Sequence, residues 1–122
     1  MVNSYVYSFL PLFSALNNDL KVYPDYGNAV APFSHNVTSN TDYTAASDGI
    51  LFLCCVSVST GGILSANING VTVANHRDGS ASSSLQIPTV FNIPMRNGDV
   101  IHITASSNTY AATNTRFVPY RR

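Results

Sequence analysis

The hydrophobic pattern is clearest in residues 43–59, where a turn pair precedes a long apolar run. Asp48-Gly49 predicts the turn, because glycine adopts a positive φ without a Cβ clash and aspartate hydrogen-bonds its own backbone. Residues 50–56 are apolar without interruption, which predicts an inner strand with both faces covered. A buried helix is the alternative for such a run, but the valine content and the nearby glycines favour a strand.

Two further strands and another inner strand follow from the same pattern. Residues 63–68 alternate between apolar and polar side chains, and Asn69-Gly70 comes directly after them. Asn-Gly between two such runs predicts a type I′ hairpin, because that turn needs positive φ at both central residues. We therefore expect residues 63–68 to pair with residues 71–74. The β-branched run at residues 100–106 predicts a second strand inside a sheet.

The remaining segments are shorter and divided by turn residues. Two prolines in residues 85–95 predict two strand pieces at a sheet edge or at a bend. Residues 75–84 and 108–114 are polar and read as surface loops, and residues 115–120 read as a last strand. About seven or eight short strands with frequent turns predict an all-β protein, a single β-sandwich or jelly roll.

The N-terminal residues 1–25 are read apart from the sandwich domain, which is expected to span residues 26–122. Tyr5, Tyr7 and Phe9 make this segment rich in aromatic side chains. Aromatic side chains bury a large area, so the segment is a candidate arm that docks on a partner. An edge strand of the domain itself is the alternative.

The charge of the chain excludes some classes of function. Six Lys and Arg balance six Asp and Glu, and all six acidic residues are aspartates, so nucleic acid binding by charge neutralisation is not expected. Cys54 and Cys55 are adjacent, so in a strand they point to opposite faces and predict two buried free thiols. Without a disulfide framework, a signal peptide or a membrane-spanning run, we expect folding in a reducing cytoplasm and no membrane insertion.

Catalytic motifs are not found in the sequence. It contains no phosphate-binding glycine loop, no zinc-ligand spacing, no nucleophile elbow and no glutamate to pair with an aspartate. We therefore expect a protein that is not an enzyme and that needs no metal or cofactor. His102 lies in a predicted strand and reads as a core or interface residue, whereas His76-Arg77-Asp78 reads as a solvated loop tip.

A binding site is predicted where two loops meet. Loops cluster at the two ends of a sandwich, so residues 75–84 and 108–114 can share one end. Tyrosine and arginine contribute disproportionately to binding. The candidate binding residues are Arg77, Asp78, Asn108 and Tyr110.

The order of several short motifs resembles a known group of domains. The motifs are residues 24–26, 43–49, 68–71, 93–101 and 116–120. Together they resemble small β-sandwich domains of tailed-bacteriophage virion proteins, namely tail-fibre tips, receptor-binding heads and decoration proteins. They also resemble the trimeric jelly rolls of the C1q and TNF type. The resemblance implies a homotrimer that is made in the host cytoplasm and located in the virion.

The main functional hypothesis is a non-enzymatic virion structural protein. It would contact other virion proteins and a host-surface glycan or protein. The alternative is a carbohydrate-binding module, because tyrosine-bearing loops rich in Asn and Ser also suit a glycan.

Overall fold

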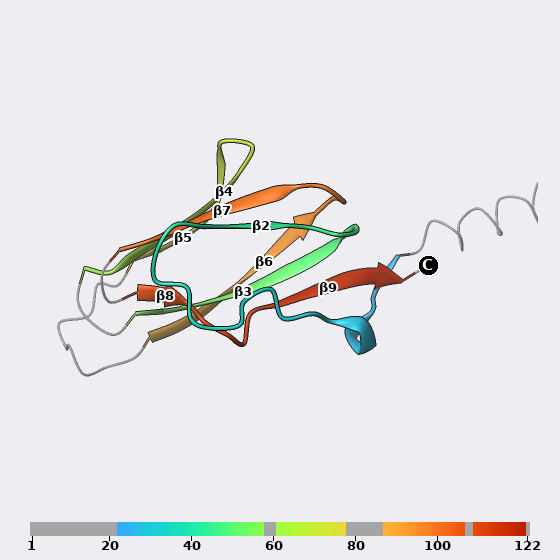
Figure 1. The fold of residues 1–122 in the computed structure, drawn as a ribbon, viewed down its shortest axis with the longest axis horizontal. Helices are drawn as coiled ribbons and strands as arrows, with labels where there is room; N and C mark the ends of the chain where they lie inside the picture. Colours follow the sequence, from blue (N-terminus) through green and yellow to red (C-terminus); the bar gives the residue numbers. More distant parts are fainter. Residues whose placement is uncertain (1–21, 58–60, 78–86, 107–108, 122) are drawn as a thin grey trace, which may run out of the picture.

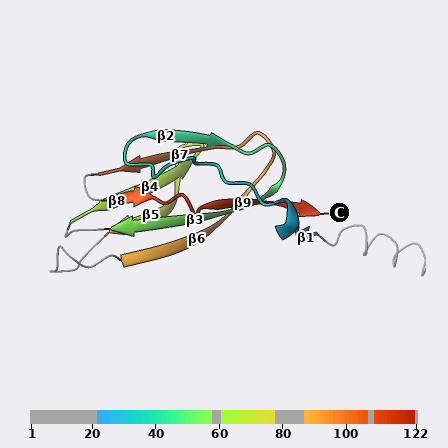
Figure 2. The ribbon, with the colours of Figure 1, turned by 60° about the horizontal axis from the view of Figure 1, so that its bottom comes forward.

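The computed structural model describes residues 22–57, 61–77, 87–106 and 109–121. Two antiparallel sheets lie face to face (Figure 1, Figure 2). The elements are β1 (Tyr23–Pro24), the 3-10 helix η1 (Tyr26–Asn28), β2 (Thr41–Thr44), β3 (Gly49–Ser57), β4 (Ile63–Ile68), β5 (Val71–Arg77), β6 (Ile87–Met95), β7 (Val100–Ala105), β8 (Thr109–Ala111) and β9 (Arg116–Arg121). The predicted all-β sandwich is confirmed.

The strand order is that of a jelly roll. One sheet, the β3 sheet, has the order β1-β9-β3-β6, and the other, the β7 sheet, has the order β2-β7-β4-β5. β9 pairs with the first part of β3 and β8 with its last part, so β8 and β9 act as one interrupted strand. When β8 and β9 are counted as one strand, each sheet has four strands, and the chain passes from one sheet to the other at every connection between successive strands except the β4–β5 hairpin. This is the jelly-roll architecture.

β3 is the central strand, as its sequence predicts. It lies between β6 on one side and β8 and β9 on the other. Leu51, Leu53 and Cys55 point to the β7 sheet and are fully buried. The expectation that both faces are covered is met in the second half of the run, where Cys54 and Val56 on the outer face are buried, but not in the first half, where Ile50 and Phe52 are only half-buried.

Gly49 is needed for a different reason than the sequence suggests. The turn prediction assigned it a positive φ, but Gly49 is not among the glycines in that conformation. It pairs with Pro119, and a Cβ there would lie 2.4 Å from the carbonyl oxygen of Val118 and 2.7 Å from Cζ of Phe117. Glycine is required because the β9 backbone approaches closely.

The Asn69-Gly70 hairpin is confirmed, with φ values of 52° and 79° at its two central residues. The β5 strand runs further than expected, so the predicted loop of residues 75–84 is wrong at its first three residues. His76 pairs with Leu64 and is buried, which continues the strand through Arg77.

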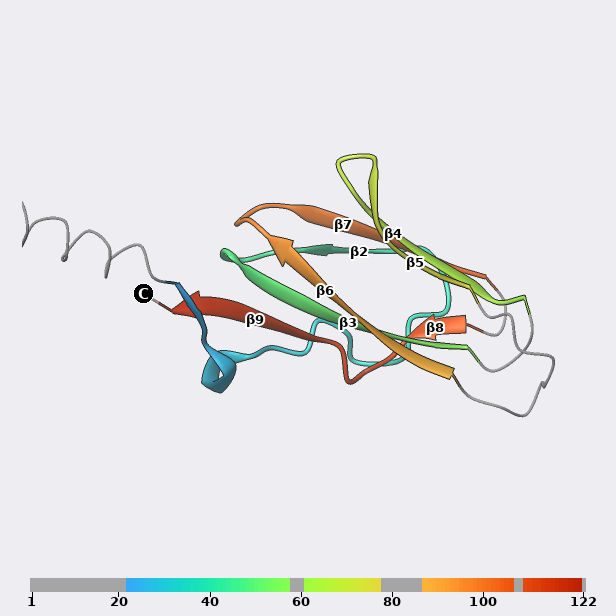
Figure 3. The same ribbon diagram turned by 180° about the vertical axis from the view of Figure 1, so that it is seen from behind.

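Two other boundaries differ from the sequence prediction. The predicted loop of residues 108–114 contains strand β8, because Thr109 and Ala111 pair with β3 and are buried. Residues 87–95 form one strand, β6, and not two pieces. β6 is an edge strand of the β3 sheet (Figure 3), so both of its prolines lie at a sheet edge, as predicted. A proline costs little at an edge because its missing N–H faces no further strand.

The core lies between the sheets, and polar contacts between described residues join the two sheets across it. Its largest fully buried apolar side chains are Phe117, Leu51, Leu53, Leu64, Ile101 and Ile103. Ser57 Oγ of β3 lies 2.8 Å from His76 Nε2 of β5, and both residues are buried. His76 was predicted at a solvated loop tip, which is wrong because β5 carries it inside.

Both cysteines are buried and free, as predicted. Cys55 lies in the main core and Cys54 in a small cluster on the outer face of the β3 sheet. Burial, together with the neighbouring Cys54, raises the pKa of the Cys55 thiol to about 12. A thiol that stays protonated is a poor nucleophile and a poor metal ligand.

The edge of β8 and β9 that faces away from β3 is covered by residues 23–37, which precede β2. Tyr23 and Pro24 pair with the end of β9, Val30 bridges to Phe117, and Val37 bridges to Ala111. Main-chain groups on that edge therefore have partners, which protects the edge from pairing with another chain.

Candidate functional site

A hollow on the outer face of the β3 sheet, here called the β9 hollow, combines aromatic and polar side chains. Its lining residues are Tyr26, Ala29, Phe52, Asn114, Arg116 and Val118. Its volume is about 280 Å³. Pockets for drug-sized ligands have volumes of about 300–1,000 Å³, so this hollow suits a smaller unit such as a single sugar ring.

The aromatic wall is formed by residues from two separate elements. Tyr26 begins η1, which lies beside β9 (Figure 1). The N–H of Asp25, directly before η1, donates to the Pro119 carbonyl of β9 at 2.7 Å. Phe52 points outward from β3. The two ring centroids are 6.4 Å apart at an angle of 35°, and Tyr26 is 67% exposed. Two aromatic side chains, one from η1 and one from β3, therefore border the hollow side by side.

The polar side of the hollow comes from the turn before β9 and from its first residue. Arg116 pairs with Phe52 in register. Its Nη1 donates to the carbonyl of Thr113 at 2.6 Å and to that of Thr115 at 2.8 Å, so the guanidinium is held in place. Among the described residues no carboxylate forms an ion pair with Arg116. Asn114 adds an amide that can donate and accept.

A second surface on the same sheet is largely apolar and is called here the apolar outer patch. Its apolar residues, from the outward positions of β3 and β6, are Ile50, Pro88, Val90 and Pro94, and the exposed Asn92 lies between Val90 and Pro94 on β6. Val90 is 57% exposed, and no described element lies over it. The apolar outer patch lies toward β6, whereas the β9 hollow lies toward η1.

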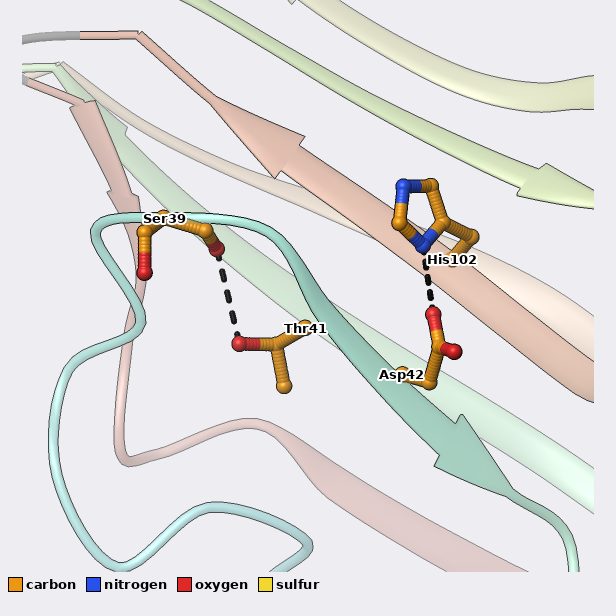
Figure 4. A network of polar contacts seen from close by, with 4 residues as sticks. All are labelled: Ser39, Thr41, Asp42 and His102. Carbon is orange, nitrogen blue, oxygen red and sulfur yellow. Dashed lines mark hydrogen bonds and ion pairs between the residues drawn. The ribbon is translucent and has the colours of Figure 1, made fainter.

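The outer face of the β7 sheet carries a contact between a histidine and an aspartate. His102 Nδ1 lies 2.5 Å from Asp42 Oδ1 across β7 and β2 (Figure 4). The side chains of His102 and Asp42 are 46% and 61% exposed. His102 was predicted to be a core or an interface residue, and the core alternative is wrong. Asn67 is the register partner of His102 on β4, and its Oδ1 is buried without a partner among the described residues.

The predicted loop site is only partly described. Asp78 and Asn108 lie outside the described residues, as do Tyr5, Tyr7 and Phe9 of the predicted docking arm. Arg77 ends β5 and is exposed, and Tyr110 lies in β8 and is half-buried.

The two described members of that site point in different directions. β5 and β7 do end at the same end of the sandwich, because Ile63 pairs with Arg77 and its carbonyl accepts from the Ser106 N–H at 2.8 Å. Arg77, however, occupies an outward position of the β7 sheet. Tyr110 packs on Cys54 and the other members of the outer cluster of the β3 sheet. The fold does not bring these two side chains together.

The residues of the β9 hollow were missed by sequence reasoning. Phe52 carries the signal that was available, because it alternates with Leu51 and Leu53 and must point away from the core. Nothing in the sequence indicates that Tyr26 and Arg116, far apart along the chain, flank Phe52.

Among the described residues, no group of three or more His, Cys, Asp or Glu side chains is placed to hold a metal ion. No helix in that part of the chain is long and apolar enough to cross a membrane.

Comparisons with known proteins give little. No protein-family model matches the chain, and no curated protein matches it. Among solved structures it is similar to CBM51 from Clostridium perfringens GH95 in complex with methyl-galactose, with 9% sequence identity and a TM-score of 0.39 over 80% of this chain and 92% of that chain. A likeness at this level carries no argument about function.

Proposed function

We propose that the chain is a non-enzymatic carbohydrate-binding domain and that the β9 hollow is its site. The observation that supports this is the aromatic pair Tyr26 and Phe52 beside Asn114 and Arg116. A sugar ring has apolar C–H faces and a rim of hydroxyls. Aromatic rings with an apolar face and a few convergent polar groups match both parts of such a ring.

The binding at one site should be weak. The hollow is open, and Tyr26 keeps most of its surface in water, so only part of a sugar is removed from solvent. We expect a dissociation constant of about 1 mM for a short oligosaccharide, which corresponds to roughly 4 kcal/mol. Several linked copies of the site would raise the avidity without a new contact.

The test is a titration with a panel of oligosaccharides, followed by NMR chemical-shift changes. Tyr26→Ala should reduce binding at least about tenfold, because exposed aromatic anchors contribute most to such contacts. Tyr23→Ala is the matched control, since Tyr23 is 57% exposed but does not line the hollow. The proposal is wrong if no oligosaccharide binds, or if Tyr26→Ala binds as tightly as the wild-type chain.

A second function, a structural domain of a phage virion that forms a homotrimer, is supported by the apolar outer patch. Exposed apolar patches on a folded domain are typical of interaction surfaces, and burial of apolar area stabilises association by about 25 cal/mol per Å². The patch and the hollow adjoin, because Ile50 of the patch pairs with Val118 of the hollow. A virion subunit that contacts a host glycan would combine the two proposals.

Self-association can be tested by light scattering of the purified chain. Val90→Lys should shift a trimer to monomers, because the lysine would be desolvated in the contact. Val71→Lys is the control, since Val71 is also exposed, at 64%, but lies on β5 in the other sheet. A wild-type chain that is monomeric at all concentrations would contradict the proposal. Mass spectrometry of purified phage particles tests the virion location.

A further inference from the structure

We infer that the β9 hollow selects acidic saccharides, in which a sugar ring carries a carboxylate. This inference rests on the proposed carbohydrate binding and adds the chemical class of the ligand. The inference rests on the guanidinium of Arg116. Two hydrogen bonds hold this group in position, and no carboxylate among the described residues forms an ion pair with it.

The geometry of Arg116 leaves its carboxylate-binding edge available. A guanidinium has five N–H donors, two of them on each Nη nitrogen. Both Nη1 contacts go to main-chain carbonyls, those of Thr113 and Thr115. No described residue accepts from the Nε and Nη2 edge. Two parallel N–H groups on one edge match the two oxygens of a carboxylate.

The positive charge in the hollow is not compensated by its surroundings. The lining contains no acidic residue among the described ones. Asp25 precedes Tyr26 but lies outside the lining, and its Oδ2 accepts from Asn28 Nδ2 at 2.7 Å. The apolar side chains of Phe52 and Val118 border the charge and exclude some water, which strengthens its attraction for an anion.

The chain as a whole does not oppose an acidic ligand. Its net charge is zero, so no long-range field repels an anionic saccharide or attracts it elsewhere. Selectivity should therefore depend on the local contact with Arg116 and should weaken with added salt.

The experiment compares one ligand with and without its carboxylates. Oligosaccharides of glucuronic acid are titrated by calorimetry beside the same oligosaccharides after reduction of each carboxylate to a primary alcohol. The acidic form should bind at least about tenfold more tightly at low ionic strength, because only a carboxylate forms two charge-assisted hydrogen bonds with one edge of the guanidinium. The difference should shrink as salt is raised.

Variants separate the charge from the aromatic contact. Arg116→Gln should remove the preference for the acidic form, whereas Arg96→Gln should keep it, because Arg96 is an exposed arginine in the turn between β6 and β7, outside the hollow. Thermal melting of each variant confirms that it is folded. Equal binding of both forms by the wild-type chain would overturn the inference but leave carbohydrate binding intact. If neither form nor any other oligosaccharide binds, the proposed function itself fails and this inference fails with it.

Discussion

Replacement of Gly49 by alanine should destabilise the fold much more than replacement of Gly70. A Cβ at residue 49 would lie 2.4 Å from the Val118 carbonyl oxygen and 2.9 Å from Cα of Pro119. Real Cβ contacts are essentially never shorter than 3.0 Å, so the β9 backbone must shift. Overpacking of this kind costs about 1–3 kcal/mol. The clash is with main-chain atoms, so we expect the upper end, about 3 kcal/mol.

The cost at Gly70 has a different origin and a smaller size. No heavy atom lies within 4 Å of a Cβ built there, but φ is +79°. A left-handed conformation costs an L-residue about 1–2 kcal/mol. Alanine recovers about 0.4–1 kcal/mol by restricting the unfolded chain, which leaves a net loss near 1 kcal/mol.

Urea unfolding followed by circular dichroism measures both free energies, with the slope m checked for two-state behaviour. The difference of about 2 kcal/mol should appear as a melting temperature lower by roughly 6–10 °C in Gly49→Ala than in Gly70→Ala. Equal losses in the two variants would refute the close approach of β9. A loss in Gly49→Ala below about 0.5 kcal/mol, the range of ordinary surface changes, would do the same.

Three more outcomes can be checked by similar means. Burial raises the pKa of Cys55 to about 12, so the thiol loses its proton at a lower pH in the unfolded chain than in the folded one. The free energy of unfolding should therefore be level below about pH 9 and fall between about pH 9 and 12. Alkaline denaturation should show a smaller fall in Cys55→Ala. Ser57→Ala leaves the buried His76 Nε2 without its partner and should cost about 1–3 kcal/mol in urea unfolding, whereas an unchanged midpoint would show that water replaces the hydroxyl. Asp42→Asn weakens an exposed contact with His102 and should change stability by less than about 1 kcal/mol. A larger loss in thermal melts would mean that the contact is shielded from solvent.

Local signals in the sequence determined several elements of this protein. Asn69-Gly70 defines the hairpin, because the conformational preferences of two adjacent residues decide its turn. The uninterrupted apolar run defines β3 as a central strand, because the apolar residues of a segment indicate by themselves that the segment is buried. Adjacent cysteines on opposite faces follow from the two-residue period of a strand.

The tertiary structure alone decided where these elements meet. The sequence predicts turn chemistry at Gly49, yet the reason for glycine is the backbone of β9, which lies far along the chain. His76 is polar and borders a predicted loop, yet pairing with Leu64 carries it into the core beside Ser57.

The candidate site shows the same division. The sequence determines that Phe52 points outward from β3, but its neighbours depend on which strand pairs with β3 and in which register. That pairing aligns Phe52 with Arg116, and the hydrogen bond from Asp25 to Pro119 brings η1 and Tyr26 beside them. Side-chain period is a local property of a strand, whereas strand order and register depend on the packing of the whole chain into two layers.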